Sequence, residues 1–233
     1  MKKKLIKLYA NMRDNSFLLR VLRNRYTANM RKELKNKDDI CIICSNCIGG
    51  IIYNNLNLKF LSPTINLYML QKDFLKFATN LEFYLKQELK FIKTKQGVCP
   101  VAHIGDGDKK IEIIFLHYNN EQEAKESWDK RKERVSYNNL YFIMSDRDGI
   151  TYDDILEYDK IPCKRKILFT YKDYPNIPYT FKLNEYNKEK CVGHYQKKSW
   201  YGFREFEIKF DYVKWINGEE NFRIDNFYSY LKK

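Results

Sequence analysis

Three side chains with catalytic potential each follow a short apolar run in this sequence: Cys47, His117 and Asp146. Cys47 stands where an apolar run turns toward two glycines, and such a turn can present a thiol beside free backbone N–H donors. A histidine base within reach would complete a nucleophilic pair. We therefore expect Cys47 to be the nucleophile, His117 the general base, and Asp146 the carboxylate that orients the histidine.

Polar residues and glycines beside these side chains are candidates for substrate binding. They are Ser45, Asn46, Gly49, Gly50, Asn119, Arg147, Asp148 and Thr170. The loop after Asp146 carries two carboxylates and a guanidinium, which can hold a sugar hydroxyl, a phosphate or a divalent cation. Each feature also has a structural interpretation: Cys47 as a small buried residue at a crowded turn, His117 as a hydrogen-bonded strand end, and residues 145–149 as a self-satisfied turn.

Cys41, Cys44 and Cys47 form a C-x-x-C-x-x-C string that is similar to part of an iron–sulfur or zinc pattern. Residues three apart on a strand point to opposite faces, so the first two thiols cannot converge on one metal. A fourth ligand at the expected spacing is also missing from the sequence. The pattern predicts no resident metal and leaves the cofactor unknown, with an acyl-CoA donor as the one candidate.

The candidates require strand ends to position them, and the pattern from residue 39 onward alternates between strand and helix. Apolar runs predict strands, and amphipathic runs predict helices. The strands are at 40–44, 111–117, 139–145 and 166–170, and the helices at 71–91, 121–134 and 152–158. This alternation predicts a three-layer α/β/α fold with a mainly parallel or mixed central sheet. Because ligands bind beyond the carboxyl ends of such strands, we expect the candidates to gather at one sheet edge.

Positive charge is concentrated at the N-terminus. Residues 1–37 hold twelve Lys or Arg and two acidic residues, a net charge of +10, which leaves only +3 of the total +13 to residues 38–233. Leu5, Leu8, Tyr9 and Met12 recur at helical spacing, as do Leu18, Val21 and Leu22 after a cap at Asn15-Ser16. We expect a basic helical arm (1–37) before a single α/β domain (38–233). The arm either packs its apolar face on that domain or contacts an anionic membrane surface.

Other partners and locations follow from composition. Nucleic-acid binding is disfavoured because the charge is confined to the arm and no recognised binding motif accompanies it. Six cysteines in a chain without a secretory signal are expected to be reduced thiols. No uncharged apolar run approaches the roughly 18 residues of a membrane span. These features predict a cytoplasmic protein that is peripheral at the inner membrane face if the arm binds lipid.

Seven strings in order along the body resemble a bacterial domain family of unknown function that carries the description exopolysaccharide biosynthesis protein. They are SNCIGG (45–50), LSPTINLY (61–68), DFLKFATNLEFYL (73–85), FLHYNNEQEAKESWDKRKERV (115–135), NLYFIMSDRDG (139–149), ILFTYKDYP (167–175) and FDYVKWING (210–218). Ile48 replaces an aromatic that is common in the family, and the basic arm lies outside the matched strings. The resemblance implies a three-layer α/β domain and a link to capsule or other surface polysaccharide, with no catalytic assignment.

A looser resemblance connects Asn46-Cys47 to capsule acetyltransferases whose first strand also ends in Asn-Cys. We therefore expect a transferase that moves a group, foremost an acyl group, to a sugar during surface polysaccharide assembly. One alternative is a metal-dependent glycosyltransferase in which Asp146 and Asp148 bind the phosphates of a nucleotide sugar. Another is a non-catalytic saccharide-binding or assembly protein that uses aromatic side chains, namely Trp128, Trp200, Tyr201 and Trp215.

Overall fold

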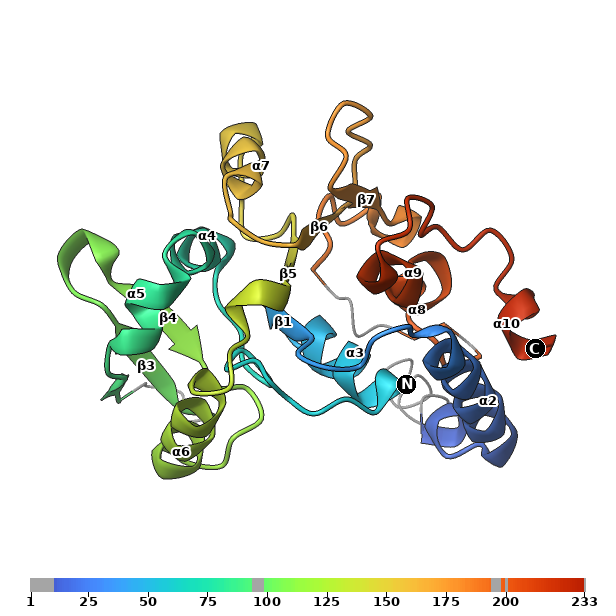
Figure 1. Cartoon of the computed structure of the whole chain (residues 1–233), viewed down its shortest axis with the longest axis horizontal. Coiled ribbons are helices and arrows are strands. Elements are labelled where there is room, and N and C mark those ends of the chain that lie inside the picture. The colour runs from blue at the N-terminus through green and yellow to red at the C-terminus, as the bar shows by residue number, and fades with distance from the viewer. Residues whose placement is uncertain (1–10, 94–98, 194–197, 200, 233) are drawn as a thin grey trace, which may run out of the picture. The chain divides into compact units, whose positions relative to one another are not determined.

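The computed structural model describes residues 11–93, 99–193, 198–199 and 201–232 (Figure 1). Contacts divide the chain into two compact units. The sheet unit comprises residues 38–54 and 58–193, and the helical unit comprises residues 1–37, 55–57 and 194–233. The sequence pattern predicts one domain over residues 38–233, whereas contacts group residues 194–233 with residues 1–37.

Four parallel strands form the main sheet of the sheet unit, in the order β1-β5-β6-β7. Their bounds are Cys41–Cys44 for β1, Leu140–Ser145 for β5, Arg165–Thr170 for β6 and Thr180–Lys182 for β7. Residues of β1 and β5 are buried throughout, as expected for strands covered on both faces. The predicted α/β class is confirmed, and the predicted strands at 40–44, 139–145 and 166–170 all belong to this sheet.

Helices cover both faces of the main sheet. On one face, α3 (Ile48–Leu56) approaches β1 so closely that Tyr53 donates its hydroxyl to the Ile40 carbonyl over 2.7 Å. On the other face, Cys41 and Phe142 share a buried cluster with Phe74 of α4 (Gln71–Thr79), which itself contacts α7 (Tyr152–Asp159). Alternate strand residues therefore pack against helices on opposite faces of the sheet, which gives the predicted order of helix layer, sheet and helix layer.

A second, antiparallel sheet corrects the predicted place of the 111–117 strand. β2 (Lys90–Ile92), β3 (Val101–Ile104) and β4 (Ile111–Ile114) pair in the order β2-β3-β4. The strand before His117 is thus not a neighbour of β1 or β5 in the main sheet. The sequence carries no signal for this difference because a short apolar run predicts a buried strand without naming its partner.

The predicted helix at 71–91 is interrupted. The structure has α4, then α5 (Leu81–Lys86), then strand β2. At the break, Asn80 donates its side-chain amide to the carbonyl of Lys76 and to the hydroxyl of Thr79. Asparagine side chains that bond nearby backbone in this way compete with helix continuation. The predicted helices at 121–134 and 152–158 are confirmed as α6 (Glu121–Lys132) and α7.

The helical unit packs α2 (Phe17–Glu33) against α9 (Tyr212–Asn217) and α10 (Tyr228–Lys232), with α8 (Glu205–Lys209) completing it. The buried Glu207 carboxylate accepts hydrogen bonds from both terminal nitrogens of Arg23, at N···O distances of 2.5 and 3.2 Å. Ser16 caps α2 as predicted, because its side chain accepts from the Leu19 N–H. The sheet unit also contains three short 3-10 helices: Gly107–Lys109, Tyr137–Asn139 and Asn184–Tyr186.

The predicted apolar stripes of the N-terminal segment do not face the core where the structure describes them. Met12, Leu18 and Val21 are exposed and Leu22 is half-buried, whereas the fully buried residues of α2 include Tyr26 and Met30. Leu5, Leu8 and Tyr9 lie outside the described residues. In the described part of the chain, no helix combines the length and the apolar character that crossing a membrane would require.

Candidate functional site at the carboxyl ends of the parallel strands

The turn after β1 buries its polar residues. Ser45 and Asn46 are fully buried, and Cys47 exposes only 6% of its surface. The Asn46 side chain accepts from the Ile48 N–H over 3.0 Å, which helps to start α3. The Cys47 Sγ lies 4.0 Å from the Leu67 carbonyl oxygen. The thiol therefore faces a neighbouring chain segment, and a substrate would need that segment to move in order to reach it.

Gly49 and Gly50 differ in what they do. A Cβ at Gly49 would lie 3.0 Å from the Cys44 Cβ, closer than ordinary packing allows, whereas the nearest atom to a Cβ at Gly50 would be 3.6 Å away. Gly49 thus permits the close approach of α3 to β1. This packing role accounts for the glycine at this position without any contact to a substrate.

Asp146 is the most strongly organised carboxylate at the ends of the strands. It follows β5, exposes 9% of its surface, and accepts the backbone N–H of Tyr171 at 2.7 Å and of Val192 at 2.6 Å. Burial raises the pKa of the Asp146 carboxyl to about 6, although the two backbone hydrogen bonds oppose this effect. A carboxyl with this pKa exchanges a proton near neutral pH, which is a requirement for an acid–base catalyst.

The neighbouring residues of the Asp146 loop are held by side chains from residues 68–71. Asp148 accepts hydrogen bonds from the Tyr68 hydroxyl and from the Gln71 amide. The Arg147 guanidinium lies 4.6 Å from the centre of the Tyr68 ring and pairs with Asp148 at 3.2 Å. The self-satisfied turn weighed in the sequence analysis is therefore present in part, with Tyr68 and Gln71 as partners that sequence reasoning missed. Tyr68 precedes α4 in a segment without regular structure, and Gln71 is the first residue of α4, so helical periodicity does not mark either one as a partner of the loop.

A cavity of about 440 to 530 Å³ occurs at each end of β5, and the larger one contains Asp146. It lies beyond β5 and β6, has a volume of about 530 Å³, and contains Asp146 and Asp148. Two lysines and three tyrosines also line it, and the rings of Tyr152 and Tyr174 stack with their centres 6.2 Å apart. Its other lining residues are Gly149, Ile150, Thr151, Tyr152, Ile155, Tyr171, Lys172, Tyr174, Lys190 and Cys191. This position matches the general location of ligands in parallel α/β sheets.

Sequence reasoning found two of the residues that line this larger cavity and missed the rest. Lys172 lies two residues after Thr170, the predicted site residue that ends β6, and was given no role. Lys190 and Cys191 come from the C-terminal third, where the pattern predicted no element. Two hydrogen bonds bring that segment to the site: the Val192 N–H donates to Asp146, and the Arg147 guanidinium donates to the Gly193 carbonyl.

His117 and Asn119 follow β4 of the second sheet, whereas Asp146 follows β5 of the main sheet. His117 is exposed in the turn between β4 and α6, and the hydrogen bonds of Asp146 go to Tyr171 and Val192 rather than to an imidazole. Asn119 donates its side-chain amide to Glu123 over 2.9 Å at the start of α6. The expectation that these residues share one sheet edge with Asp146 depended on the strand assignment corrected above. His103 lies in β3, opposite Lys90 of β2 and Glu112 of β4, and His194 lies outside the described residues.

Thr170 ends β6 and is fully buried, and its hydroxyl donates to the Lys172 carbonyl over 2.8 Å. Four other buried polar atoms near the strand ends have no hydrogen-bond partner among the described residues: Ser45 Oγ, Asn46 Nδ2, Gln71 Oε1 and Ser145 Oγ. Buried polar atoms in native proteins are usually satisfied, often by ordered water. These atoms therefore have unused capacity to bind water or a polar ligand.

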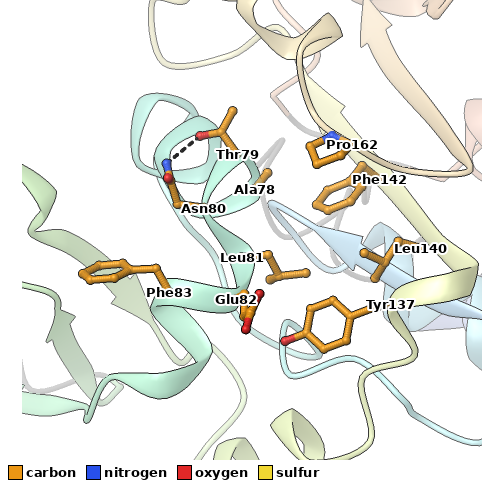
Figure 2. Close-up of a pocket in the computed structure, with 10 residues that line it drawn as sticks. All are labelled: Ala78, Thr79, Asn80, Leu81, Glu82, Phe83, Tyr137, Leu140, Phe142 and Pro162. Carbon is orange, nitrogen blue, oxygen red and sulfur yellow. Dashed lines mark hydrogen bonds between the residues drawn. The ribbon is translucent and has the colours of Figure 1, made fainter.

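The smaller cavity lies at the opposite end of β5 and has a different character. Figure 2 shows Leu140, Phe142, Tyr137 and Pro162 on one side of it and the α4–α5 junction on the other, with Phe83 pointing away. Its volume is about 440 Å³, and its one carboxylate, Glu82, pairs with Lys86 at 2.6 Å. This arrangement provides a largely apolar recess, and the pairing with Lys86 lowers the pKa of its one carboxylate, Glu82.

The aromatic residues proposed for saccharide binding mostly lie in cores. Trp128 exposes 1% of its surface and packs against Phe77 and Phe115, and Trp215 is equally buried. Tyr201 contacts Phe203 and Phe227, and Trp200 lies outside the described residues. Among the described residues, no group of three or more His, Cys, Asp or Glu side chains is arranged to hold a metal ion. Asp146 and Asp148 are the two carboxylates of the larger cavity that a metal could use.

Comparison with known proteins places this chain in a family. Residues 18–217 match the model described as "Domain of unknown function (DUF1919)". The match begins within α2, so the N-terminal segment is not wholly outside the family's region. A relative described as "Uncharacterized protein" from Haemophilus influenzae is 36% identical over 212 residues, which cover 91% of this chain and 96% of the relative. The chain belongs to the DUF1919 domain family.

Proposed function

We propose that this protein is a transferase that moves a group from a nucleotide-bearing donor to a saccharide hydroxyl during the assembly of a surface polysaccharide. The observation that carries this proposal is the cavity beyond β5 and β6, where Asp146, with its pKa raised to about 6, is grouped with tyrosines and lysines. Sugar rings stack on tyrosine faces, and lysines attract phosphate. The link to polysaccharide assembly is supported by the family resemblance alone.

Asp146 is the general base in this proposal. The acceptor hydroxyl forms a new bond to the donor carbon, the bond from that carbon to the leaving group breaks, and Asp146 accepts the hydroxyl proton. With an acyl-CoA donor, the proton then passes to the thiolate of CoA. With a nucleotide-sugar donor, the nucleoside diphosphate leaves as an anion and the proton is released to solvent. Lys172 and Lys190 are positioned at the cavity to bind the diphosphate that both kinds of donor contain.

Direct transfer gives Cys47 no covalent role, because its thiol is buried against Leu67 and does not line this cavity. The Cys47 nucleophile, with His117 as its base, remains a separate hypothesis. It predicts an acyl-enzyme on Cys47 and loss of turnover in Cys47→Ala. Direct transfer predicts that Cys47→Ala retains turnover.

The test uses the full chain with saccharide acceptors and two donors, acetyl-CoA and UDP-glucose, each with and without Mn²⁺. Release of CoA or UDP that depends on acceptor supports transfer, and the productive donor identifies the group moved. We expect Asp146→Asn to lower turnover by about 100-fold or more, the usual effect of losing a general base. Asp153→Asn, on the exposed first turn of α7, is the matched control and should retain activity.

Binding measurements separate the enzyme from a non-catalytic saccharide-binding protein. Titration calorimetry with each donor should show weaker binding in Lys172→Ala than in the unmutated protein. Unchanged donor binding in Lys172→Ala, or saccharide binding without turnover for any donor, would contradict the transferase.

A further inference from the structure

Helix α2 presents an apolar face to solvent on the side opposite its buried face. Phe17 exposes 71% of its surface, Leu18 65% and Val21 44%. At about 100° per residue, these three positions lie on one side of the helix, whereas Tyr26 and Met30 lie on the other. The buried side already packs in the helical unit, so the exposed side chains contribute nothing to that core. Met12, just before α2, is 67% exposed as well.

Positive charge surrounds this apolar face. Of the basic residues of α2, Arg23 pairs with Glu207, whereas Arg20, Arg25 and Lys32 are exposed. Arg20 and Arg25 are exposed beside the apolar side chains, and the Arg20 guanidinium lies 5.6 Å from the centre of the Phe17 ring. Lys2, Lys3, Lys4 and Lys7 add further charge in the sequence before α2. Exposed aromatic and aliphatic side chains flanked by arginines form the pattern of a helix that lies in a membrane interface.

We propose that the exposed face of α2 binds the surface of an anionic lipid bilayer, with Phe17, Leu18 and Val21 in the headgroup region and Arg20 and Arg25 on the lipid phosphates. The proposal does not depend on the transferase function, because the face belongs to the helical unit and the larger cavity to the sheet unit. The charge alone would also suit RNA. Two of the three exposed apolar side chains, Leu18 and Val21, are aliphatic and cannot stack on bases, which favours lipid over RNA.

Such contact would hold the protein at a membrane without a spanning segment. One short apolar face with flanking cations binds reversibly, and each basic residue near the surface adds only a modest attraction. The attraction between arginine and lipid phosphate is screened by salt. Binding should therefore require anionic lipid and weaken as salt concentration rises.

The test is flotation of the full chain with vesicles of phosphatidylcholine, either alone or mixed with phosphatidylglycerol. We expect recovery with the anionic vesicles only. The variant Phe17→Ser/Leu18→Ser/Val21→Ser should lower the partition coefficient by about tenfold or more, because it removes most of the apolar surface available for insertion. Arg20→Glu/Arg25→Glu should abolish the preference for phosphatidylglycerol.

Two matched controls test whether the effect is local to α2. Leu156→Ser removes a side chain from α7 whose exposed fraction, 44%, equals that of Val21. Lys130→Glu/Lys188→Glu makes the same change in net charge at exposed positions of the sheet unit. Both controls should float like the unmutated protein. Equal flotation of the α2 variants and the controls would overturn the proposal.

Other partners would also be revealed by these variants. Sedimentation of the unmutated protein as a dimer that the apolar variant disrupts, without vesicle binding, would assign the face to a second copy of this chain and overturn the proposal. Retention of single-stranded RNA without vesicle binding would overturn it in favour of nucleic acid. Circular dichroism of each variant establishes that α2 still folds.

Discussion

We expect the contribution of Asp146 to the free energy of unfolding to fall as the pH rises from about 4 to about 6. Its pKa rises from the ordinary 3.8 to about 6 because the carboxyl is buried. Below pH 3.8, both the folded and the unfolded chain hold the proton. Between the two pKa values, the unfolded chain releases the proton and the folded chain retains it, so unfolding becomes easier as pH rises. Above about pH 6, the full cost of burying the charge, about 3 kcal/mol, is present.

The assay compares the unmutated protein with Asp146→Asn by chemical denaturation at several pH values. The variant has no titrating group at this position, so other carboxyls cancel in the difference. Asparagine also brings its amide toward the Tyr171 and Val192 N–H groups, which adds a penalty that does not vary with pH. We expect the difference in unfolding free energy to change by about 3 kcal/mol across this range, in the direction that disfavours the unmutated protein at high pH.

A direct measurement accompanies the stability series. The carboxyl ¹³C resonance of Asp146 should titrate with a midpoint near 6. A midpoint near the ordinary value, together with a stability difference that stays constant across the series, would refute the reasoning. In that case the two backbone hydrogen bonds would offset the effect of burial on the pKa, and Asp146 would be an ionised structural residue rather than a base.

Three further predictions concern packing, the buried ion pair and the thiols. Gly49→Ala should destabilise the protein by about 1 to 3 kcal/mol in urea denaturation, because the new Cβ would crowd Cys44, whereas Gly50→Ala should be tolerated. Glu207→Gln should cost about 3 kcal/mol in the same assay, because it leaves the Arg23 charge without its partner; a loss below about 0.5 kcal/mol would contradict the buried pair. Mass mapping of alkylated thiols should find the three partly exposed cysteines modified before the three buried ones, and early labelling of Cys47 would contradict its burial.

The sequence alone determined the parallel α/β core and the identity of its strand ends. Continuous apolar runs such as residues 139–145 can be satisfied only when both faces are covered, so burial and strand type follow from composition. The loop that contains Asp146 follows such a run directly, and its place at the carboxyl edge follows from topology. The cap at Ser16 is equally local, because one side chain and the next turn of helix suffice to define it.

Tertiary structure decided which of those strand ends meet. The run before His117 looks like the others, and only its pairing with β3 places it in a separate sheet. Likewise, burial and hydrogen bonds from residues more than twenty positions away set the pKa of Asp146, and Val192 and Tyr171 carry no local mark of that role. The apolar face of α2 gives the same lesson: helical spacing defines the face, but only packing shows that Tyr26 occupies the core and that Phe17 does not. Periodicity therefore predicts the type of element and its apolar face, whereas long-range contacts determine which other elements that face packs against.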